Sequence, residues 1–533
     1  MSSEPSNFVI QEYPSTKVLK KAFHPQQFNS KLQKLPEKDQ RFIEEFKKRE
    51  KPNKKLDPRG SVSINFSENP KNLRGFSVKN DRHHHSKHKP KHITASDFKS
   101  STLNESQSGN SLPIPSSTVT LEKKSLIDLS YKYFIGPGNN DSLVKRIMAE
   151  KTGWVKAFTP HSANLIWTEV KQYGIFELIP IGLERKHRGQ EEAKPKPTSL
   201  ENLTEGERLK LKLYSKVEGN KELASKKKLF YNMTMYYKNI GDNTFKYLPL
   251  TFHVIDGTKD PAFAEFTKKF NDFQKEMGKD PHFNNVWILK PGESTNRGIG
   301  ITVCSTVDEV AKVVDDKKSS GNMQRTYIVQ KYLYRPMLYL NRKFDIRCYT
   351  LVTFLDNKVA AYFYKDGYLR TSCQEFNMDN IKDRFIHLTN DAVQKNSPDY
   401  GRFEDGNKLS YDEFQAYIDE NLSEKVNFRE TVYPKIRKIV ADTIKATHKK
   451  LDLKRRKYSF EVFGYDFMLD EMYTPWLLEV NTNPCLALSG QYLTKLIPQM
   501  LKHAFDIVFP PLFPGSEQSS SNQFEQVFSY RRN

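Results

Sequence analysis

Two acidic residues and an amide in the C-terminal third of the chain have the types and spacing of a cation-binding site. Residues 461–470 alternate apolar and polar side chains around aromatics, and residues 475–480 form a second apolar run, so the pattern predicts two strands joined by a short turn. If the last residue of the first strand pairs with the first residue of the second, Asp466 faces Glu479, with Cβ atoms roughly 4.5–5.5 Å apart. Asn481 lies two residues after Glu479 and therefore on the same face.

This hairpin favours the chemistry of a divalent cation. Opposed carboxylates repel each other unless a cation lies between them. Carboxylate and amide oxygens suit Mg²⁺, which in proteins usually also binds the phosphates of a substrate. The alternative is a surface hairpin with unrelated acids. However, the flanking aromatic residues indicate a covered sheet, on which acidic side chains need partners. The pattern therefore points to a nucleotide enzyme.

A second segment, VWILKPGESTNRGIGI at residues 286–301, joins a predicted strand to a glycine-rich loop. The strand delivers Lys290 into a loop that contains Gly292, Gly298 and Gly300. Glycines let backbone N–H groups approach phosphates, and a lysine adds a positive charge. The spacing is neither that of a Walker loop nor that of a dinucleotide fingerprint. A glycine-rich hairpin turn with a surface lysine explains the segment equally well.

A third segment, RKFDIRCYT at residues 342–350, places three charged side chains on one face of a predicted strand. Lys343, Asp345 and Arg347 share that face, while the intervening residues are apolar. Arg370 follows the next predicted hairpin and could join the same face. The alternative is an exposed strand face with a local ladder of ion pairs.

Composition restricts the class of protein. The 533-residue chain holds 85 Lys+Arg against 64 Asp+Glu, a formal net charge of +21. Residues 1–125 are rich in Ser, Lys, Asn and Pro, and their 24 basic and 13 acidic residues contribute +11 of that charge, so we expect a disordered basic N-terminal region. Excess positive charge favours polyanionic partners. The four cysteines show no paired spacing, which fits a reducing, cytoplasmic compartment, and no apolar run is long enough to predict a membrane span.

Strands and helices alternate densely from about residue 248 to 513, with antiparallel hairpins among them. This mixture predicts an α+β fold rather than a doubly wound parallel sheet. Residues 515–533 are polar, and we expect them to form a disordered tail.

Seven motifs in a fixed order resemble the tubulin–tyrosine ligase-like family: VWILKP, YIVQKYL, KFDIRCY, GYLRT, HLTN, GYDFMLD and LLEVNTNP. The resemblance covers residues 131–513. It implies an ATP-grasp-type fold with an N-terminal subdomain at residues 126–247, a central subdomain at 248–340 and a C-terminal subdomain carrying the Mg²⁺ site at 341–514. Members of this family are ATP-dependent ligases that add amino acids to tubulin and some other acidic proteins.

The resemblance also implies roles for individual residues. Lys290, with the loop glycines Gly298 and Gly300, would contact the ATP phosphates. The adenine pocket would be lined by Gln330, Lys331 and Leu333, and Asn390 would help to hold the phosphates. Lys343 and Asp345 would hold the nucleotide and orient phosphoryl transfer, while Arg347 and Arg370 would face the γ-phosphate and the acceptor carboxylate. Mg²⁺ would bind Asp466, Glu479 and Asn481. The family also has a lysine on an early helix, which we assign to Lys227 within the run SKKK.

The implied function is ATP-dependent ligation of an amino acid to acidic protein tails, with tubulin or microtubules as the partner and polyglycylation as the favoured activity. We expect a monomer that uses ATP, Mg²⁺ and a free amino acid. We expect it in the cytoplasm at the cytoskeleton, which includes the microtubules of a cilium or flagellum. A polyglutamylase or tyrosine ligase of the same family is the alternative. Two alternatives come from other classes: an inactive ATP-grasp protein that binds microtubules, and a basic nucleic-acid-binding protein. No recognition-module signature supports the second of these, so we expect no nucleic-acid partner.

Overall fold

The computed structural model describes residues 130–138, 140–181, 200–280, 282–292, 298–316, 326–516 and 519–532. These residues fall in one compact unit, Thr118–Asn533. The predicted disordered region, residues 1–125, lies outside the described residues, as do residues 293–297 of the glycine-rich loop. In the described part of the chain, no helix is long and apolar enough to cross a membrane.

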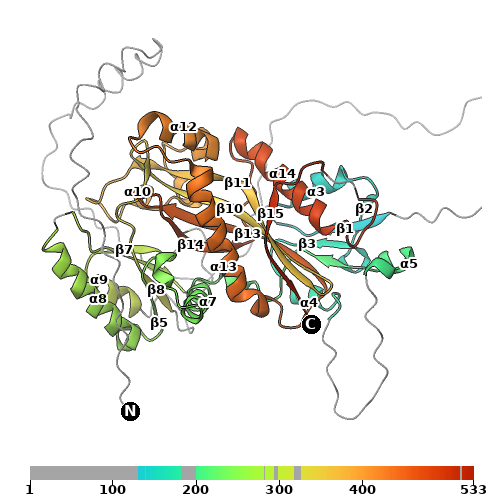
Figure 1. Ribbon diagram of the computed structural model, residues 1–533, viewed down its shortest axis with the longest axis horizontal. Helices are drawn as coiled ribbons and strands as arrows, with labels where there is room; N and C mark the ends of the chain where they lie inside the picture. The colour runs from blue at the N-terminus through green and yellow to red at the C-terminus, as the bar shows by residue number, and fades with distance from the viewer. Residues whose placement is uncertain are drawn as a thin grey trace, which may run out of the picture. The chain divides into compact units, whose positions relative to one another are not determined.

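A large mixed sheet forms the centre of this unit (Figure 1). Its strands, in spatial order, are β12 (Lys408–Ser410), β11 (Lys358–Glu375), β10 (Arg342–Leu355), β13 (Tyr458–Leu469), β4 (Leu213–Tyr214), β3 (Leu165–Trp167), β1 (Tyr131–Ile135) and β2 (Trp154–Lys156). Three further strands pair with this row: β14 (Pro475–Thr482) with β13, β15 (Phe524–Arg531) with β11, and β9 (Leu338–Tyr339) with β10. The predicted antiparallel hairpins occupy the middle, whereas β13, β4, β3, β1 and β2 pair in parallel. The sheet is therefore mixed.

Helices cover both faces of the large sheet. Side chains of α7 (Lys226–Asn239), α12 (Tyr411–Asn421) and α13 (Tyr433–Leu451) share one apolar core with β10 and β13. Those of α3 (Asp141–Ala149) and α14 (Gln491–Val508) share a second core on the opposite face. Strand alternation explains the division, because Phe344 and Ile346 of β10 point into the first core while Tyr349 and Leu351 point into the second. Lys343, Asp345 and Arg347 therefore lie on the α14 side of β10, and all three are buried.

A smaller antiparallel sheet holds the strands on either side of the glycine-rich loop (green in Figure 1). Its order is β5 (Thr251–Val254), β8 (Tyr327–Lys331), β6 (Trp287–Pro291) and β7 (Thr302–Cys304), and α8 (Pro261–Met277) and α9 (Val307–Val314) pack against it. Helix α8 begins where the Asp260 side chain accepts a hydrogen bond from the backbone N–H of Ala262, with proline at the first helical position. Phe266 of α8 meets the buried Trp287 ring edge to face at 5.0 Å, which fixes the helix on the sheet.

The short helices α4 (Tyr173–Phe176), α5 (Glu205–Arg208), α6 (Lys221–Ala224), α10 (Arg384–His387) and α11 (Asp391–Gln394) complete the described α-helices. The apolar pattern of residues 174–181 suggests a strand, and this interpretation is wrong. Ile175, Phe176 and Ile179 are buried together at the one-and-four spacing of a helical turn, and α4 begins at Tyr173.

The prediction of a disordered tail at residues 515–533 is also wrong for its second half. Strand β15 pairs antiparallel with β11, and the Phe524 ring packs on the Tyr364 ring at 4.7 Å. Arg532 forms an ion pair with Asp452 at 2.8 Å. This strand was missed from the sequence because its run FEQVFSYR is short, only partly apolar and preceded by a polar stretch. Its partner, β11, is 18 residues long.

Candidate active site

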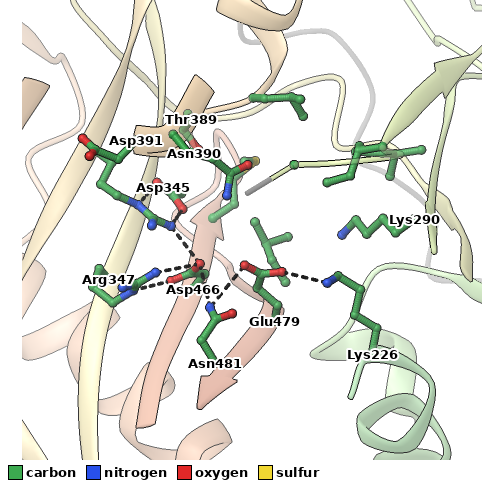
Figure 2. A pocket seen from close by; sticks show the side chains of 18 of the residues that line it. Lys226, Lys290, Asp345, Arg347, Thr389, Asn390, Asp391, Asp466, Glu479 and Asn481 are labelled. Carbon is green, nitrogen blue, oxygen red and sulfur yellow. Dashed lines mark hydrogen bonds and ion pairs between the residues drawn. The ribbon is translucent and has the colours of Figure 1, made fainter. Parts of the chain in front are cut away.

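A cavity of about 520 Å³ lies between the two sheets, and most of the site residues predicted from the sequence line it (Figure 2). It is lined by Lys290, Gly298, Gln330, Lys331, Leu333, Lys343, Asp345, Arg347, Arg370, Asn390, Asp466, Glu479 and Asn481. All of these were candidates from the sequence. Two further candidates, Lys227 and Gly300, are not among the lining residues. Gly298 and Gly300 both have positive φ, +71° and +73°, which the glycine-rich spacing anticipates.

The hairpin β13–β14 places Asp466 opposite Glu479, as predicted. The register near the turn differs from the prediction, because Leu469 rather than Asp470 pairs with Pro475. A bulge between the Asp466 and Phe467 pairs adds one residue to β14 and restores the predicted facing pair. The Asn481 side chain completes the group, with its amide nitrogen 3.3 Å from Asp466 Oδ2 and 3.2 Å from Glu479 Oε1.

Cross-strand register also assembles a buried network of ion pairs beneath this hairpin. Arg347 lies directly opposite Asp466, and Arg370 lies directly opposite Asp345. Arg347 Nε is 2.6 Å from Asp466 Oδ1, and Arg370 Nη2 is 2.8 Å from Asp466 Oδ2. Arg370 also donates to both carboxylate oxygens of Asp345. Burial alone would raise the pKa of Asp466, but the charges of Arg347 and then Arg370 outweigh it and hold that pKa well below its usual range.

The small sheet contributes lysines on both of its faces. Lys290 Nζ lies 2.7 Å from Gln330 Oε1 at the cavity, and burial lowers the pKa of Lys290 to about 8. Lys331 follows Gln330 and so points to the other face. Its ammonium donates to the backbone oxygen of Asn284 at 2.6 Å and is surrounded by aromatic rings. Lys331 therefore borders the cavity without turning its charge toward it.

The early-helix lysine at the cavity is Lys226, not Lys227. Lys226 begins α7, lines the cavity and places Nζ 3.4 Å from Glu479 Oε2. Lys228 instead pairs with Glu222, and its side chain is 46% exposed. The sequence does not show which of the three consecutive lysines reaches the cavity, because they differ only in the direction in which each side chain leaves the helix axis.

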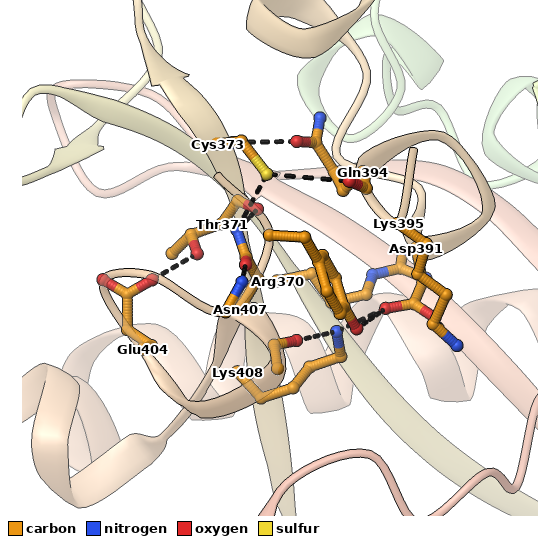
Figure 3. Close-up of polar contacts among 12 residues, drawn as sticks. Arg370, Thr371, Cys373, Asp391, Gln394, Lys395, Glu404, Asn407 and Lys408 are labelled. Carbon is orange, nitrogen blue, oxygen red and sulfur yellow. Dashed lines mark hydrogen bonds and ion pairs between the residues drawn. The ribbon is translucent and has the colours of Figure 1, made fainter. Parts of the chain in front are cut away.

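Several residues that line the cavity could not be predicted as site residues from the sequence, and Asp391 is the clearest example. It follows Asn390 and accepts hydrogen bonds from Lys395 and Lys408, both at 2.7 Å, and from the Tyr400 hydroxyl at 2.8 Å (Figure 3). Burial would raise the pKa of Asp391, but Lys408 and Lys395 lower it to about 2. This network fixes the loop that presents Asn390 to the cavity.

Taken together, the side chains suit a ligand with several phosphates. Among the described residues, no group of three or more His, Cys, Asp or Glu could hold a metal ion. The oxygens of Asp466, Glu479 and Asn481 therefore fit a Mg²⁺ ion only if phosphates and water complete its ligands, which is the usual arrangement for this ion.

Comparison with known proteins identifies the family. The family model described as tubulin-tyrosine ligase family matches residues 206–517. Tubulin glycylase 3B of Drosophila melanogaster is 36% identical over 248 residues, which are 46% of this chain and 31% of that protein. Tubulin glycylase 3D of Tetrahymena thermophila is 33% identical over 313 residues, 56% of this chain and 28% of that protein. A Tetrahymena thermophila protein named "probable alpha-tubulin polyglutamylase" is 29% identical over 248 residues, 45% of this chain and 58% of that protein.

The chain thus spans about a third or less of the length of the two glycylases that it matches. The matched family segment, however, includes all of the cavity-lining residues except Asn140 and Glu169. Because the family model covers more than half of the sequence, this chain belongs to the tubulin-tyrosine ligase family.

Proposed function

We propose that this chain is an ATP-dependent ligase that adds amino acids to acidic protein tails, with tubulin as the target and glycine as the favoured amino acid. One observation carries the proposal. Buried cations converge with a pair of acids in a single cavity that has room for a nucleotide, and the residues concerned are Lys290, Lys343, Arg347, Arg370, Asp466 and Glu479. Such a set stabilises charge on a transferring phosphoryl group.

The proposed reaction proceeds through an acyl phosphate. A carboxylate oxygen of the acceptor attacks the γ-phosphorus of ATP, and ADP leaves. The amino group of the incoming amino acid then attacks the acyl carbon, inorganic phosphate leaves, and the nitrogen loses a proton as the C–N bond forms. No protein nucleophile is required. The residues therefore bind and orient the reactants and stabilise charge.

Each cation has a proposed place in this reaction. Lys226, Lys290 and Lys343 hold the nucleotide phosphates. Arg347 and Arg370 face the γ-phosphate and the acceptor carboxylate. Both arginines already bind acids, but a guanidinium has five N–H donors and can keep those partners while it contacts a phosphate. When bound by Asp466, Glu479 and Asn481, Mg²⁺ would neutralise phosphate charge. Asn481 would turn its amide so that the oxygen, rather than the nitrogen, faces the ion.

The two sheets on either side of the cavity support an ATP-grasp type of fold. We assign residues 126–247, 248–340 and 341–514 to its N-terminal, central and C-terminal subdomains, and strand β15 extends the last of these. Residues 1–125 form a basic region that precedes them.

Glycine is favoured because the relatives described above include two proteins named tubulin glycylases. A tubulin polyglutamylase remains the alternative, since a relative of that name also matches. The net charge of +21 supports an acidic protein as the target, because acidic tails are attracted to a basic surface. The protein would therefore act at microtubules in the cytoplasm, including those of a cilium or flagellum.

The test is a transfer assay with purified protein, ATP, Mg²⁺, tubulin and each radiolabelled amino acid in turn. We expect label to enter tubulin with glycine. Glu479→Gln, which keeps the fold but removes one charge of the acid pair, should greatly reduce transfer at low Mg²⁺, whereas Arg335→Gln, at an ion pair with Glu471 outside the cavity, should leave it unchanged. Transfer of glutamate or tyrosine instead would select the alternative activity. A folded protein that binds ATP but transfers no amino acid would refute the ligase and support the inactive microtubule-binding protein.

A further inference from the structure

Three buried side chains from three separate elements meet at one edge of the cavity. Tyr332 follows β8 of the small sheet, Lys343 belongs to β10 of the large sheet, and His387 ends α10. Lys343 Nζ lies 2.7 Å from the Tyr332 hydroxyl, and that hydroxyl lies 2.7 Å from His387 Nδ1. Lys343 Nζ also donates to the backbone oxygen of His387 at 3.1 Å.

The donor and acceptor roles along this chain of hydrogen bonds follow from elementary chemistry. A lysine ammonium only donates, so the Tyr332 oxygen accepts a hydrogen bond from Lys343, and the Tyr332 hydroxyl donates one to His387 Nδ1. The imidazole must then carry its hydrogen on Nε2, which lies 3.0 Å from the backbone oxygen of Asn380. The contacts therefore define His387 as neutral and as the Nε2–H tautomer.

The surroundings hold the lysine in this one orientation. Its ammonium lies 4.3 Å from the centre of the Tyr332 ring and 5.9 Å from that of Phe376. The His387 ring meets both of these rings nearly edge to face, at 5.6 Å and 5.8 Å. A free lysine side chain has many rotamers, and fixing it before the ligand arrives reduces the entropic cost of binding.

The ammonium also keeps a donor for a ligand. Of its three N–H groups, two are used by Tyr332 and by the His387 carbonyl, the acceptors found for it among the described residues. Burial lowers the pKa of Lys343 to about 7, with Asp345 opposing and Lys290 adding to the effect. A bound phosphate would supply the negative charge that favours the ammonium.

We propose that Tyr332 and His387 are positioning residues that hold Lys343 in the orientation required by a nucleotide phosphate. The Tyr332 hydroxyl accepts a hydrogen bond from Lys343, and His387 holds that hydroxyl in place. The inference rests on the proposed function, because it assumes that Lys343 binds ATP. It assigns a purpose to the histidine of the HLTN motif, which has no other role in the site. The contact between Lys343 and Tyr332 also joins the large sheet to the small sheet at the cavity where the nucleotide would lie.

The test compares the same chemical change, Tyr to Phe, at two positions in the segment between β8 and β9. Tyr332→Phe removes the hydroxyl but keeps the ring. Tyr334→Phe removes a hydroxyl two residues later, where the ring faces Lys331 rather than Lys343. Direct binding of ATP to the full chain should weaken about tenfold in Tyr332→Phe and change less than about twofold in Tyr334→Phe. At saturating ATP, the turnover number of Tyr332→Phe should fall by a smaller factor than its ATP affinity, because the main proposed role of Lys343 is to bind the nucleotide phosphates.

The histidine supplies an independent measurement. His387→Asn retains an acceptor near the position of Nδ1 and should keep most of the ATP affinity, whereas His387→Ala should lose it to the same extent as Tyr332→Phe. The ¹⁵N imidazole spectrum of the wild type at pH 7, with the His387 signal identified by its loss in His387→Asn, should show the neutral Nε2–H form.

Two results would overturn the positioning role while leaving the ligase intact: ATP affinity in Tyr332→Phe equal to that of the wild type, or an equal loss in Tyr332→Phe and Tyr334→Phe. A protonated or Nδ1–H imidazole in the wild type would do the same, even if the variants fail to fold. A wild-type protein that binds no ATP would instead refute the proposed function together with this inference.

Discussion

The two acids of the hairpin should respond differently to the loss of their charge. Asp466 is 2% exposed and forms close ion pairs with Arg347 and Arg370. The Glu479 side chain is 23% exposed and contacts Lys226 at 3.4 Å. Asp466→Asn therefore leaves two buried guanidinium groups without their shared carboxylate. Glu479→Gln removes one charge at the open side of the cavity.

The expected magnitudes follow from these environments. Removing one partner of a buried ion pair costs about 3–5 kcal/mol, because an uncompensated charge remains in the interior. A partly exposed pair contributes about 0–1 kcal/mol. Since folded proteins are stable by only about 5–15 kcal/mol, Asp466→Asn should destabilise the fold severely and Glu479→Gln should not. The sequence pattern treats the two acids alike and would predict retained folding for both.

Urea unfolding of both variants, with ATP binding measured at several Mg²⁺ concentrations, separates the two effects. Glu479→Gln should unfold at the wild-type midpoint and need more Mg²⁺ for the same ATP affinity. Asp466→Asn should unfold at a clearly lower midpoint even without nucleotide. The reasoning fails if Asp466→Asn is as stable as wild type, or if Glu479→Gln has an unchanged Mg²⁺ requirement.

Three further outcomes are expected. Lys226→Met should weaken ATP binding roughly 10–100-fold, the range for one lost charged hydrogen bond, and the exposed Lys228→Met should change it less than about twofold in the same titration. Deleting residues 519–533 removes β15 and the buried Phe524, so the free energy of unfolding should fall by at least about 2 kcal/mol in urea melts. Burial, followed by the charge of Lys343, lowers the pKa of His387 to about 4, against about 6.5 when unfolded. The unfolded state therefore binds more protons between these values, and stability should decrease as pH falls through them, less steeply in His387→Asn.

The parts of the site that could be predicted from sequence are those set by strand geometry. Lys343, Asp345 and Arg347 alternate along β10, so their common face follows from the period of two. Asp466 and Glu479 lie on the two strands of one hairpin, where pairing is local. Lys226 was missed because three adjacent lysines differ only in their angle around α7, and nothing local fixes that angle.

The hairpin also shows how a correct pair can follow from an incorrect register. Pairing Asp470 with Pro475 puts every facing pair one residue out near the turn, where Leu469 in fact faces Pro475. The bulge beyond Phe467 shifts the β14 register by one residue, and only the pairs past it agree with the prediction. Without the bulge, Glu479 would turn to the opposite face of the sheet and leave the cavity. The bulge thus sets Glu479 beside Asp466 by leaving Leu478 as the one extra residue of β14. Deletion of Leu478 should therefore remove the bulge and keep Glu479 opposite Asp466, so the Mg²⁺ dependence of ATP binding should stay close to that of the wild type; a lost Mg²⁺ dependence would contradict this account of the register.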